Sequence, residues 1–297
     1  MVDKNKFTIS SLLKNSIEVL GEGDYFNPLL DAQILLMHLL DVDKIYLYTH
    51  KGEVIDEEIV EKYLKLIDLR KSRYPLQYII GTQEFMGLDF KVTEGVLIPR
   101  PDTEVLIENI LDIVSDGYFK DKETINIVDI GTGSGAITLS LAHFISNSSV
   151  YSVDISAEAL CIAKENAENL SLKHKVKFLS GSLLEPLHAE NLEGKIDILV
   201  SNPPYIPTEV IENLQTEVST YEPKLALDGG LDGLDFYRNI IDGATSFMSR
   251  RSIIAFEIGH DQGQSVKDLL IQNGNFKDIR VIADLSGHNR VIIGDRV

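Results

Sequence analysis

The sequence predicts an α/β protein with a doubly wound, mostly parallel sheet, preceded by a small N-terminal helical bundle and a β-hairpin connector. Apolar residues recur at helical spacing over the first 80 residues. From residue 125 onward, strand-like apolar runs alternate with helical ones. Such alternation is typical of parallel strands covered by helices on both faces. We therefore divide the chain into a helical domain (1–80), a connector (81–98) and a sheet domain (99–297).

Three helices are expected in the helical domain, because its apolar side chains fall on one face at a period of 3.6 residues. Ser10 or Ser11 can cap the first helix, and Gly21 can end it. The second is expected at 28–40, where it opens with a proline. The third starts after residue 56 and is stopped by Pro75.

The connector is expected to be a β-hairpin, because aromatic and aliphatic residues are interspersed there with three glycines. A rigid loop follows, since Pro99 and Pro101 stand on either side of Arg100. Asp102 or Thr103 can then cap a helix that continues to about residue 115.

The sheet domain is expected to contain seven strands. Strand-like runs that alternate with helices lie at 125–130, 150–154, 176–179, 196–201 and 252–257. The helical runs lie at 136–145, 157–170, 235–247 and 262–272. Two further strands, at 276–282 and 290–293, would close the sheet.

The turn after the first of these strands predicts a nucleotide-like cofactor. Gly131, Gly133 and Ala136 fit the spacing G-x-G-x-x-G/A, and Asp154 ends the next strand about 20 residues later. Glycine lets the backbone approach a ligand closely, and a carboxylate can accept hydrogen bonds from ribose hydroxyls. These residues alone fit NAD and S-adenosylmethionine nearly equally well. The structural alternatives are a glycine turn without a ligand and an Asp154 that only caps the following helix.

A second turn, Asn202-Pro203-Pro204-Tyr205, follows the fourth strand, where doubly wound folds bind ligands. The side-chain carbonyl of Asn202 and the main-chain carbonyl of Pro203 could accept both hydrogens of an NH2 group, and Tyr205 could stack on it. Such bonds raise electron density on a weakly nucleophilic nitrogen and hold its lone pair toward a methyl donor. Together the two turns favour S-adenosylmethionine-dependent methylation of an amide or amino nitrogen. An NAD-dependent oxidoreductase would leave the second turn without a role, and a non-catalytic binding module would leave both unexplained.

Asn-Pro-Pro-Tyr behind a glycine-rich first turn resembles the class I amino-methyltransferases. From about residue 10 to 297 the chain resembles, within this class, the peptide chain release factor N5-glutamine methyltransferase family. The segment Ile-Pro-Arg-Pro-Asp-Thr-Glu at 98–104 makes the resemblance specific. The other matching segments are 78–81, 85–87, 129–135, 200–205, 226–234, 257–259 and 284–291.

The resemblance implies methyl transfer from S-adenosylmethionine to the glutamine of a Gly-Gly-Gln loop in class 1 release factors, which the helical domain would help to recognise. The implied catalytic residues are Asn202, Pro203 and Tyr205, joined in substrate binding by Pro204 and Arg100. The implied cofactor-binding residues are Gly131, Thr132, Gly133, Ser134, Gly135, Asp154, Ser182, Leu183 and Asn202. Many members carry an acidic residue and an aromatic near the adenine, where this chain has Ser182, which could hydrogen-bond, and Leu183, which could cover the ring.

Two alternative acceptors remain open. A sister enzyme with similar motifs would methylate a glutamine of a ribosomal protein. The exocyclic NH2 of adenine in DNA or RNA would also suit the second turn. The net charge of -18 disfavours the nucleic-acid reading, because binding to phosphates requires a basic surface.

Composition indicates a cytoplasmic enzyme with no membrane partner. No apolar run approaches the roughly 20 residues of a membrane span, and the first ten residues lack the apolar core of a secretory signal. The single cysteine, Cys161, rules out a disulfide within the chain and is expected to pack inside a helix. His260 and His288 lack the spacing of metal ligands, so no metal is expected. Glu257, at the end of the fifth strand, could face the site or serve only as a structural carboxylate. Arg100 could line the mouth of the acceptor site or only pair with Asp102 or Glu104.

Overall fold

The computed structural model describes residues 7–21 and 27–297. The chain forms two compact units. One runs up to Gly81 and also includes Gln215–Tyr221, and the other comprises Thr82–Leu214 and Glu222–Val297. The first is the helical unit and the second is the sheet unit, and each is described by itself.

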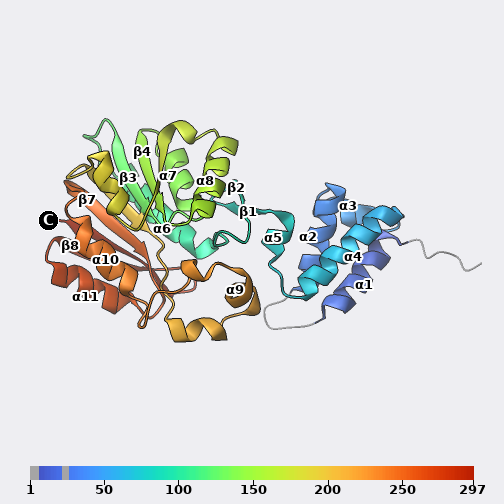
Figure 1. Cartoon of the computed structure of the whole chain (residues 1–297). Coiled ribbons are helices and arrows are strands. Elements are labelled where there is room, and N and C mark those ends of the chain that lie inside the picture. Colours follow the sequence, from blue (N-terminus) through green and yellow to red (C-terminus); the bar gives the residue numbers. More distant parts are fainter. Residues whose placement is uncertain (1–6, 22–26) are drawn as a thin grey trace, which may run out of the picture. The chain divides into compact units, whose positions relative to one another are not determined.

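The helical unit is built from six helices in its described part. They are α1 (Ile9–Leu20), α2 (Pro28–Leu40), α3 (Lys44–Thr49), α4 (Glu57–Lys71), α5 (Leu76–Ile80) and α9 (Thr216–Tyr221), seen in Figure 1. The predicted helix at 28–40 is confirmed in full, whereas α3 and α5 were not expected. The predicted cap of α1 is wrong: Thr8 is the N-cap residue, and its Oγ1 accepts a hydrogen bond from the backbone N of Ser11. The backbone N of Thr8 in turn donates a hydrogen bond to Ser11 Oγ at 2.9 Å, which completes a capping box.

A buried ion pair joins distant parts of the helical unit. The Nε of Arg70 in α4 donates to Asp31 Oδ2 in α2 at 2.7 Å, and its Nη1 lies 3.3 Å from Glu217 Oε1 in α9. The Tyr221 hydroxyl also donates to the main-chain oxygen of Ser72. These contacts explain why a short segment from late in the chain belongs to this unit.

The predicted connector forms a hairpin of β1 (Thr82–Phe85) and β2 (Leu88–Lys91), which pair antiparallel. Its two-residue turn has positive φ angles at Met86 and Gly87, as tight hairpins of twisted strands require. Phe85 and Phe90 are buried in one core of the sheet unit.

The sheet unit contains a seven-stranded sheet in the order β5-β4-β3-β6-β7-β9-β8. β9 runs opposite to the other six strands of this sheet. The strands are β3 (Ile125–Ile130), β4 (Ser148–Asp154), β5 (Val176–Ser180), β6 (Ile196–Ser201), β7 (Met248–Glu257), β8 (Phe276–Ala283) and β9 (Asn289–Arg296). The predicted fold class is confirmed. The direction of chain progression reverses between β3 and β6, which creates the switch point where such sheets bind ligands.

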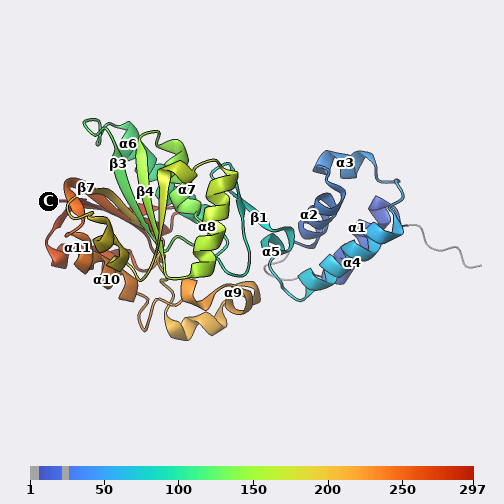
Figure 2. The same ribbon diagram turned by 45° about the horizontal axis from the view of Figure 1, so that its top comes forward.

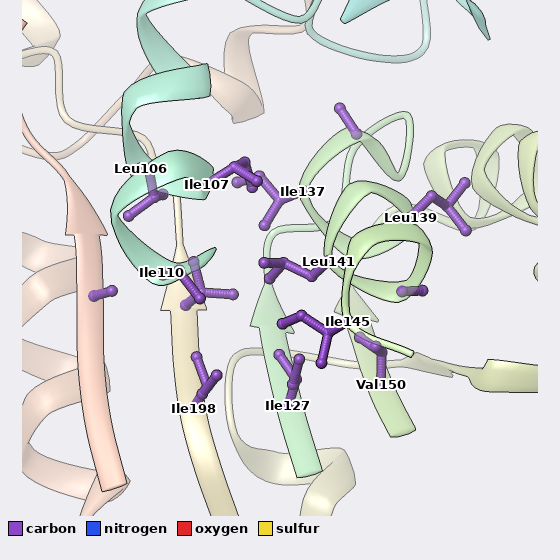
Figure 3. Packing of buried hydrophobic residues seen from close by; sticks show 14 of the residues in the cluster. Leu106, Ile107, Ile110, Ile127, Ile137, Leu139, Leu141, Ile145, Val150 and Ile198 are labelled. Atoms are coloured by element: carbon purple, nitrogen blue, oxygen red, sulfur yellow. The ribbon is translucent and has the colours of Figure 1, made fainter. Parts of the chain in front are cut away.

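Helices cover both faces of the sheet (Figures 1 and 2). One face carries α6 (Pro101–Ser115), α7 (Ala136–Phe144) and α8 (Ala157–Asn169), and the other carries α10 (Asp235–Ala244) and α11 (Gly263–Asn273). Side chains alternate along β3: Ile127 packs in the first core, and Val128 packs in the second. Figure 3 shows side chains of α6 and α7 gathered over β3 and β6 in the first core. The 3-10 helices of the sheet unit are Lys173–Lys175, Glu185–Glu190, Thr208–Asn213 and Lys224–Ala226.

Three local expectations are wrong. Helix α6 begins at Pro101, so Asp102 and Thr103 lie in its first turn and neither caps it. The helix predicted at 235–247 ends at Ala244, because β7 already begins at Met248. Cys161 is exposed on α8, since it lies on the polar face of that helix. None of the helices in the described part of the chain is both long and apolar enough to cross a bilayer.

Candidate active site

The turns after β3 and β6 border the same cavity in the sheet unit, with a volume of about 250 Å³. The cavity lies at the carboxyl ends of β3, β4 and β6, at the switch point of the sheet. Eight residues singled out in the sequence lie in its wall: Gly131, Gly133, Asp154, Ser182, Leu183, Asn202, Pro203 and Pro204.

The glycine turn leaves room at the cavity. Gly131 and Gly133 have φ angles of 82° and 56°, which favour glycine because other residues are strained there. A Cβ on Gly133 would meet no atom within 4 Å, so a side chain there would occupy open space at the cavity wall. A Cβ on Gly131 would lie 3.9 Å from the main-chain oxygen of Asn202. The two turns are therefore adjacent.

Asp154 is held in place by the glycine turn and by the start of α8. Its Oδ2 accepts a hydrogen bond from the N of Gly133 at 2.9 Å, and its Oδ1 accepts one from the N of Ser156 at 2.8 Å. The N-cap residue of α8 is Ser156 rather than Asp154. The carboxylate is thus fixed at the cavity wall and retains acceptor capacity for further donors.

Three residues of the glycine-rich stretch are not part of the cavity wall. The Thr132 hydroxyl lies 2.6 Å from the Ser152 hydroxyl, and both Thr132 and Ser134 are buried. Gly135 precedes α7, and a Cβ there would lie 3.2 Å from the Cβ of Ala163. These residues shape the turn, and their contact with a cofactor stays a prediction.

A buried carboxylate that sequence reasoning did not single out lies next to the turn. Asp129 is fully buried in β3, where burial raises its pKa to about 7. Its Oδ2 accepts a hydrogen bond from the Thr138 hydroxyl in α7, which in turn lies 2.8 Å from the Ser152 hydroxyl. This network ties β3, β4 and α7 together behind the glycine turn.

The Asn-Pro-Pro-Tyr turn is fixed by hydrogen bonds at both of its ends. Just before it, the Ser201 hydroxyl donates to the main-chain oxygen of Ile130, which fastens the end of β6 to the end of β3. Asn202 Nδ2 lies 3.3 Å from Thr103 Oγ1. The Tyr205 hydroxyl donates to Glu257 Oε1 at 3.2 Å, and burial together with that carboxylate raises the pKa of Tyr205 above its usual range. The ring of Tyr205 packs against the second core and is not part of the cavity wall.

Arg100 is held by a partner from outside its own loop. The sequence suggested a pair with Asp102 or Glu104, or a place at the acceptor mouth. Instead Arg100 Nη2 lies 2.6 Å from Glu222 Oε1, and that carboxylate is buried and attracts a cation. Glu104 accepts a hydrogen bond from the N of Met86, and Asp102 pairs with Arg290 at 3.2 Å. The pair with Asp102 or Glu104 is therefore wrong, and substrate contact by Arg100 stays a prediction.

Comparison with known proteins identifies the family. The chain matches the PrmC N-terminal domain over residues 11–81 and a methyltransferase domain over residues 121–256. It is 42% identical to the release factor glutamine methyltransferase of Moorella thermoacetica, over 97% of this chain and 99% of that protein. It is 41% identical to the enzyme of the same name from Clostridium botulinum, over 96% and 98% of the two chains. The chain belongs to the release factor glutamine methyltransferase family. The resemblance seen in the sequence is thereby confirmed, and the protein is a methyltransferase.

A solved structure with the same fold is the catalytic domain of hMettl16 in complex with the MAT2A 3′UTR hairpin 1. The TM-score is 0.56 with 13% identity, over 83% of each chain. At that identity the likeness concerns the methyltransferase fold alone.

Several wall residues of the methyltransferase cavity were missed from the sequence. They are Gly95, Val96, Leu97, Ser156, Pro223, Leu225, Ala226 and Phe236. The signal at Gly95 was its residue type, because glycine in a loop lets another group approach closely; a Cβ there would lie 2.3 Å from the side chain of Glu158 in α8, which would have to shift. The residues at 223–226 come from an irregular loop with no periodic pattern, so nothing in their order indicated the site.

Proposed function

We propose that this cytoplasmic methyltransferase transfers a methyl group from S-adenosylmethionine to the side-chain amide nitrogen of the glutamine in the Gly-Gly-Gln motif of class 1 release factors, in support of translation termination. The observation that carries the proposal is the meeting of the glycine turn and the Asn-Pro-Pro-Tyr turn at one cavity. Membership of the release factor glutamine methyltransferase family supports the choice of substrate.

The residues at the cavity fit S-adenosylmethionine. Asp154 presents a fixed carboxylate to ribose hydroxyls, and Gly133 leaves the space that a side chain would fill. We propose that Ser182 hydrogen-bonds near the adenine while Leu183 covers its ring. When bound, the cofactor supplies an electrophilic methyl group on a sulfonium.

The Asn-Pro-Pro-Tyr turn fits a carboxamide. Asn202 Nδ2 is engaged by Thr103, so the carbonyl end of that side chain is left to accept an N–H from the substrate. The Pro203 carbonyl can accept the second N–H. Both hydrogen bonds polarise the N–H bonds of the amide. This raises the electron density on the nitrogen and orients its lone pair. The nitrogen would take the methyl group as the methyl–sulfur bond breaks and S-adenosylhomocysteine leaves, and it would release one proton to water, so no strong base is required.

The test is to incubate the full chain with methyl-labelled S-adenosylmethionine and an intact class 1 release factor, and to map the label by mass spectrometry. We expect the label on the glutamine of the Gly-Gly-Gln motif and none when that glutamine is replaced by alanine. Label on a ribosomal-protein glutamine or on adenine, with none on the release factor, would decide for one of the alternative acceptors.

The same assay tests the acceptor turn. Asn202→Ala should lower turnover by about 100- to 1000-fold, as loss of a preorganised polar contact does, and should change cofactor affinity far less. Tyr205→Phe should be mild, because the ring that packs against the second core remains, whereas Tyr205→Ala should be severe, because it removes that packing next to the turn. Near-normal turnover of Asn202→Ala would contradict the proposed role of the turn.

A further inference from the structure

The buried carboxylate at the end of β7 holds two hydroxyl groups of the site. Glu257 is 2% exposed. Its Oε2 accepts a hydrogen bond from Thr103 Oγ1 of α6 at 2.5 Å, and its Oε1 accepts one from the Tyr205 hydroxyl at 3.2 Å. One carboxylate thus connects the helix α6 with the Asn-Pro-Pro-Tyr turn.

The direction of these bonds determines the orientation of Asn202. An ionised carboxylate only accepts hydrogen bonds, so the Thr103 hydroxyl gives its single hydrogen to Glu257 when that residue is ionised. Its oxygen can then only accept from Asn202, and the neighbour at 3.3 Å must be the NH2 group. The two ends of a side-chain amide have nearly the same shape, so packing alone would not select between them.

Two neighbours of Glu257 favour its acceptor role. Burial keeps the pKa of Glu257 above its usual value, whereas the hydrogen bond from Thr103 and the positive charge of Arg290 act in the opposite direction and favour the ionised carboxylate. Arg290 is itself held between Asp102 and Asp284 at 3.2 and 3.4 Å. The main-chain oxygen of Glu257 accepts a hydrogen bond from the Tyr237 hydroxyl, which fixes the backbone at this point.

We propose that Glu257, acting through Thr103, is a positioning residue that keeps the carbonyl end of the Asn202 amide directed at the substrate. The proposal rests on the proposed function, because it assumes that Asn202 must present an acceptor. With the opposite orientation, Asn202 would present an NH2 group to the NH2 group of the substrate, and two donors cannot pair. Neither Glu257 nor Thr103 is part of the cavity wall, so we assign them an indirect role through Asn202.

A matched pair of variants in the full chain tests the proposal kinetically. Thr103→Val keeps the shape of the side chain and removes the hydroxyl, whereas Thr103→Ser keeps the hydroxyl. We expect Thr103→Val to lower kcat by about 10- to 100-fold, as misplacement of a reacting group does, with little change in KM or in affinity for S-adenosylhomocysteine. Thr103→Ser should keep most of the wild-type kcat. In an Asn202→Ala background, Thr103→Val should cause no further loss, because the orientation that it controls no longer exists.

Two kinetic results would overturn the proposal: wild-type kcat in Thr103→Val, or the same loss from this substitution with and without Asn202. The second result would show that Thr103 acts independently of the amide.

A second measurement decides the orientation without any turnover. The side-chain NH2 of Asn202 can be followed by NMR in the full chain labelled at asparagine. We expect one of its two hydrogens to exchange slowly with solvent in the wild type and in Thr103→Ser, and both to exchange fast in Thr103→Val. Fast exchange of both hydrogens in the wild type would overturn the proposal, even if the Val variant failed to fold. If the wild type methylates no release factor, the proposed function fails. The exchange measurement still shows whether Thr103 fixes the orientation of the Asn202 amide.

Discussion

Asp154 shows how one side chain serves both the local fold and the cavity. Two backbone N–H groups hold its carboxylate, and the residue is part of the cavity wall. Asp154→Ala should weaken binding of S-adenosylhomocysteine by about 1.5–3 kcal/mol, the usual contribution of hydrogen bonds to a charged group. Isothermal titration calorimetry measures this loss.

A matched control for Asp154 lies in the helical unit. Asp43 accepts a hydrogen bond from the N of Tyr46 at 2.8 Å and caps α3. Asp43→Ala removes the same chemical group from a backbone N–H and should leave cofactor affinity unchanged. Equal affinity of Asp154→Ala and the wild type, or tight binding of NAD by the wild type, would contradict the cofactor assignment.

Residue roles could be predicted from the sequence where the backbone alone sets them. Strand ends and turn geometry were enough to predict a place at the site for Gly131, Gly133 and Asp154. All three lie at the cavity. Thr103 was expected to cap a helix, but Pro101 takes the first helical position, which its fixed φ suits. Thr103 therefore points across to Glu257, a residue 154 positions away, and no local rule contains that contact.

The loop that precedes α10 packs against the Asn-Pro-Pro-Tyr turn. Gly233 has a φ of 73°, and a Cβ on it would lie 2.3 Å from the main-chain oxygen of Tyr205. Gln262 Nε2 donates to that same oxygen and to the oxygen of Gly233. Gly233→Ala should therefore displace the turn and lower turnover, in addition to losing about 1–2 kcal/mol of stability from the left-handed backbone.

Gly274, just after α11, provides the control for this loop. Its φ is 75°, yet a Cβ there would meet no atom within 4 Å. Gly274→Ala should lose similar stability in thermal unfolding while its turnover at 25 °C stays close to that of the wild type. Equal turnover in the two variants would show that the loop does not position the acceptor turn.

Helices and strands could be predicted where they are long enough to show their own period in the sequence. The runs at 28–40, 125–130 and 196–201 match α2, β3 and β6 residue for residue, because each has a clear apolar pattern between strong boundaries. The helices α3, α5 and α9 have five or six residues, too few to show a period of 3.6. Their places depend on tertiary packing rather than on their own sequence.

The whole molecule combines a helical unit and a sheet unit whose boundary is not a single point in the sequence. The prediction of 1–80 as a helical domain took no account of Gln215–Tyr221, which belongs with that unit. Arg70 and Glu217 are 147 positions apart, so their contact could not be read from the sequence. A deletion of residues 1–80 would remove Arg70 and leave the partly buried carboxylate of Glu217 behind. The role of the helical unit is therefore better tested by changing the substrate than by truncating the enzyme.

The whole-molecule prediction concerns the size of the substrate. We propose that the helical unit helps to bind the release factor, so an intact, folded release factor should be methylated far faster than a short peptide containing Gly-Gly-Gln. Binding energy away from the reacting group orients the amide, and a peptide lacks most of it, so kcat as well as KM should suffer. Initial rates with both substrates at saturating S-adenosylmethionine measure the difference, and a peptide with alanine in place of glutamine gives the background. Duplex DNA and bulk RNA should accept no methyl group even at low salt, where nonspecific binding to nucleic acid is strongest. A peptide as good as the folded protein would show that the sheet unit alone recognises the substrate, and the helical unit would then need another role.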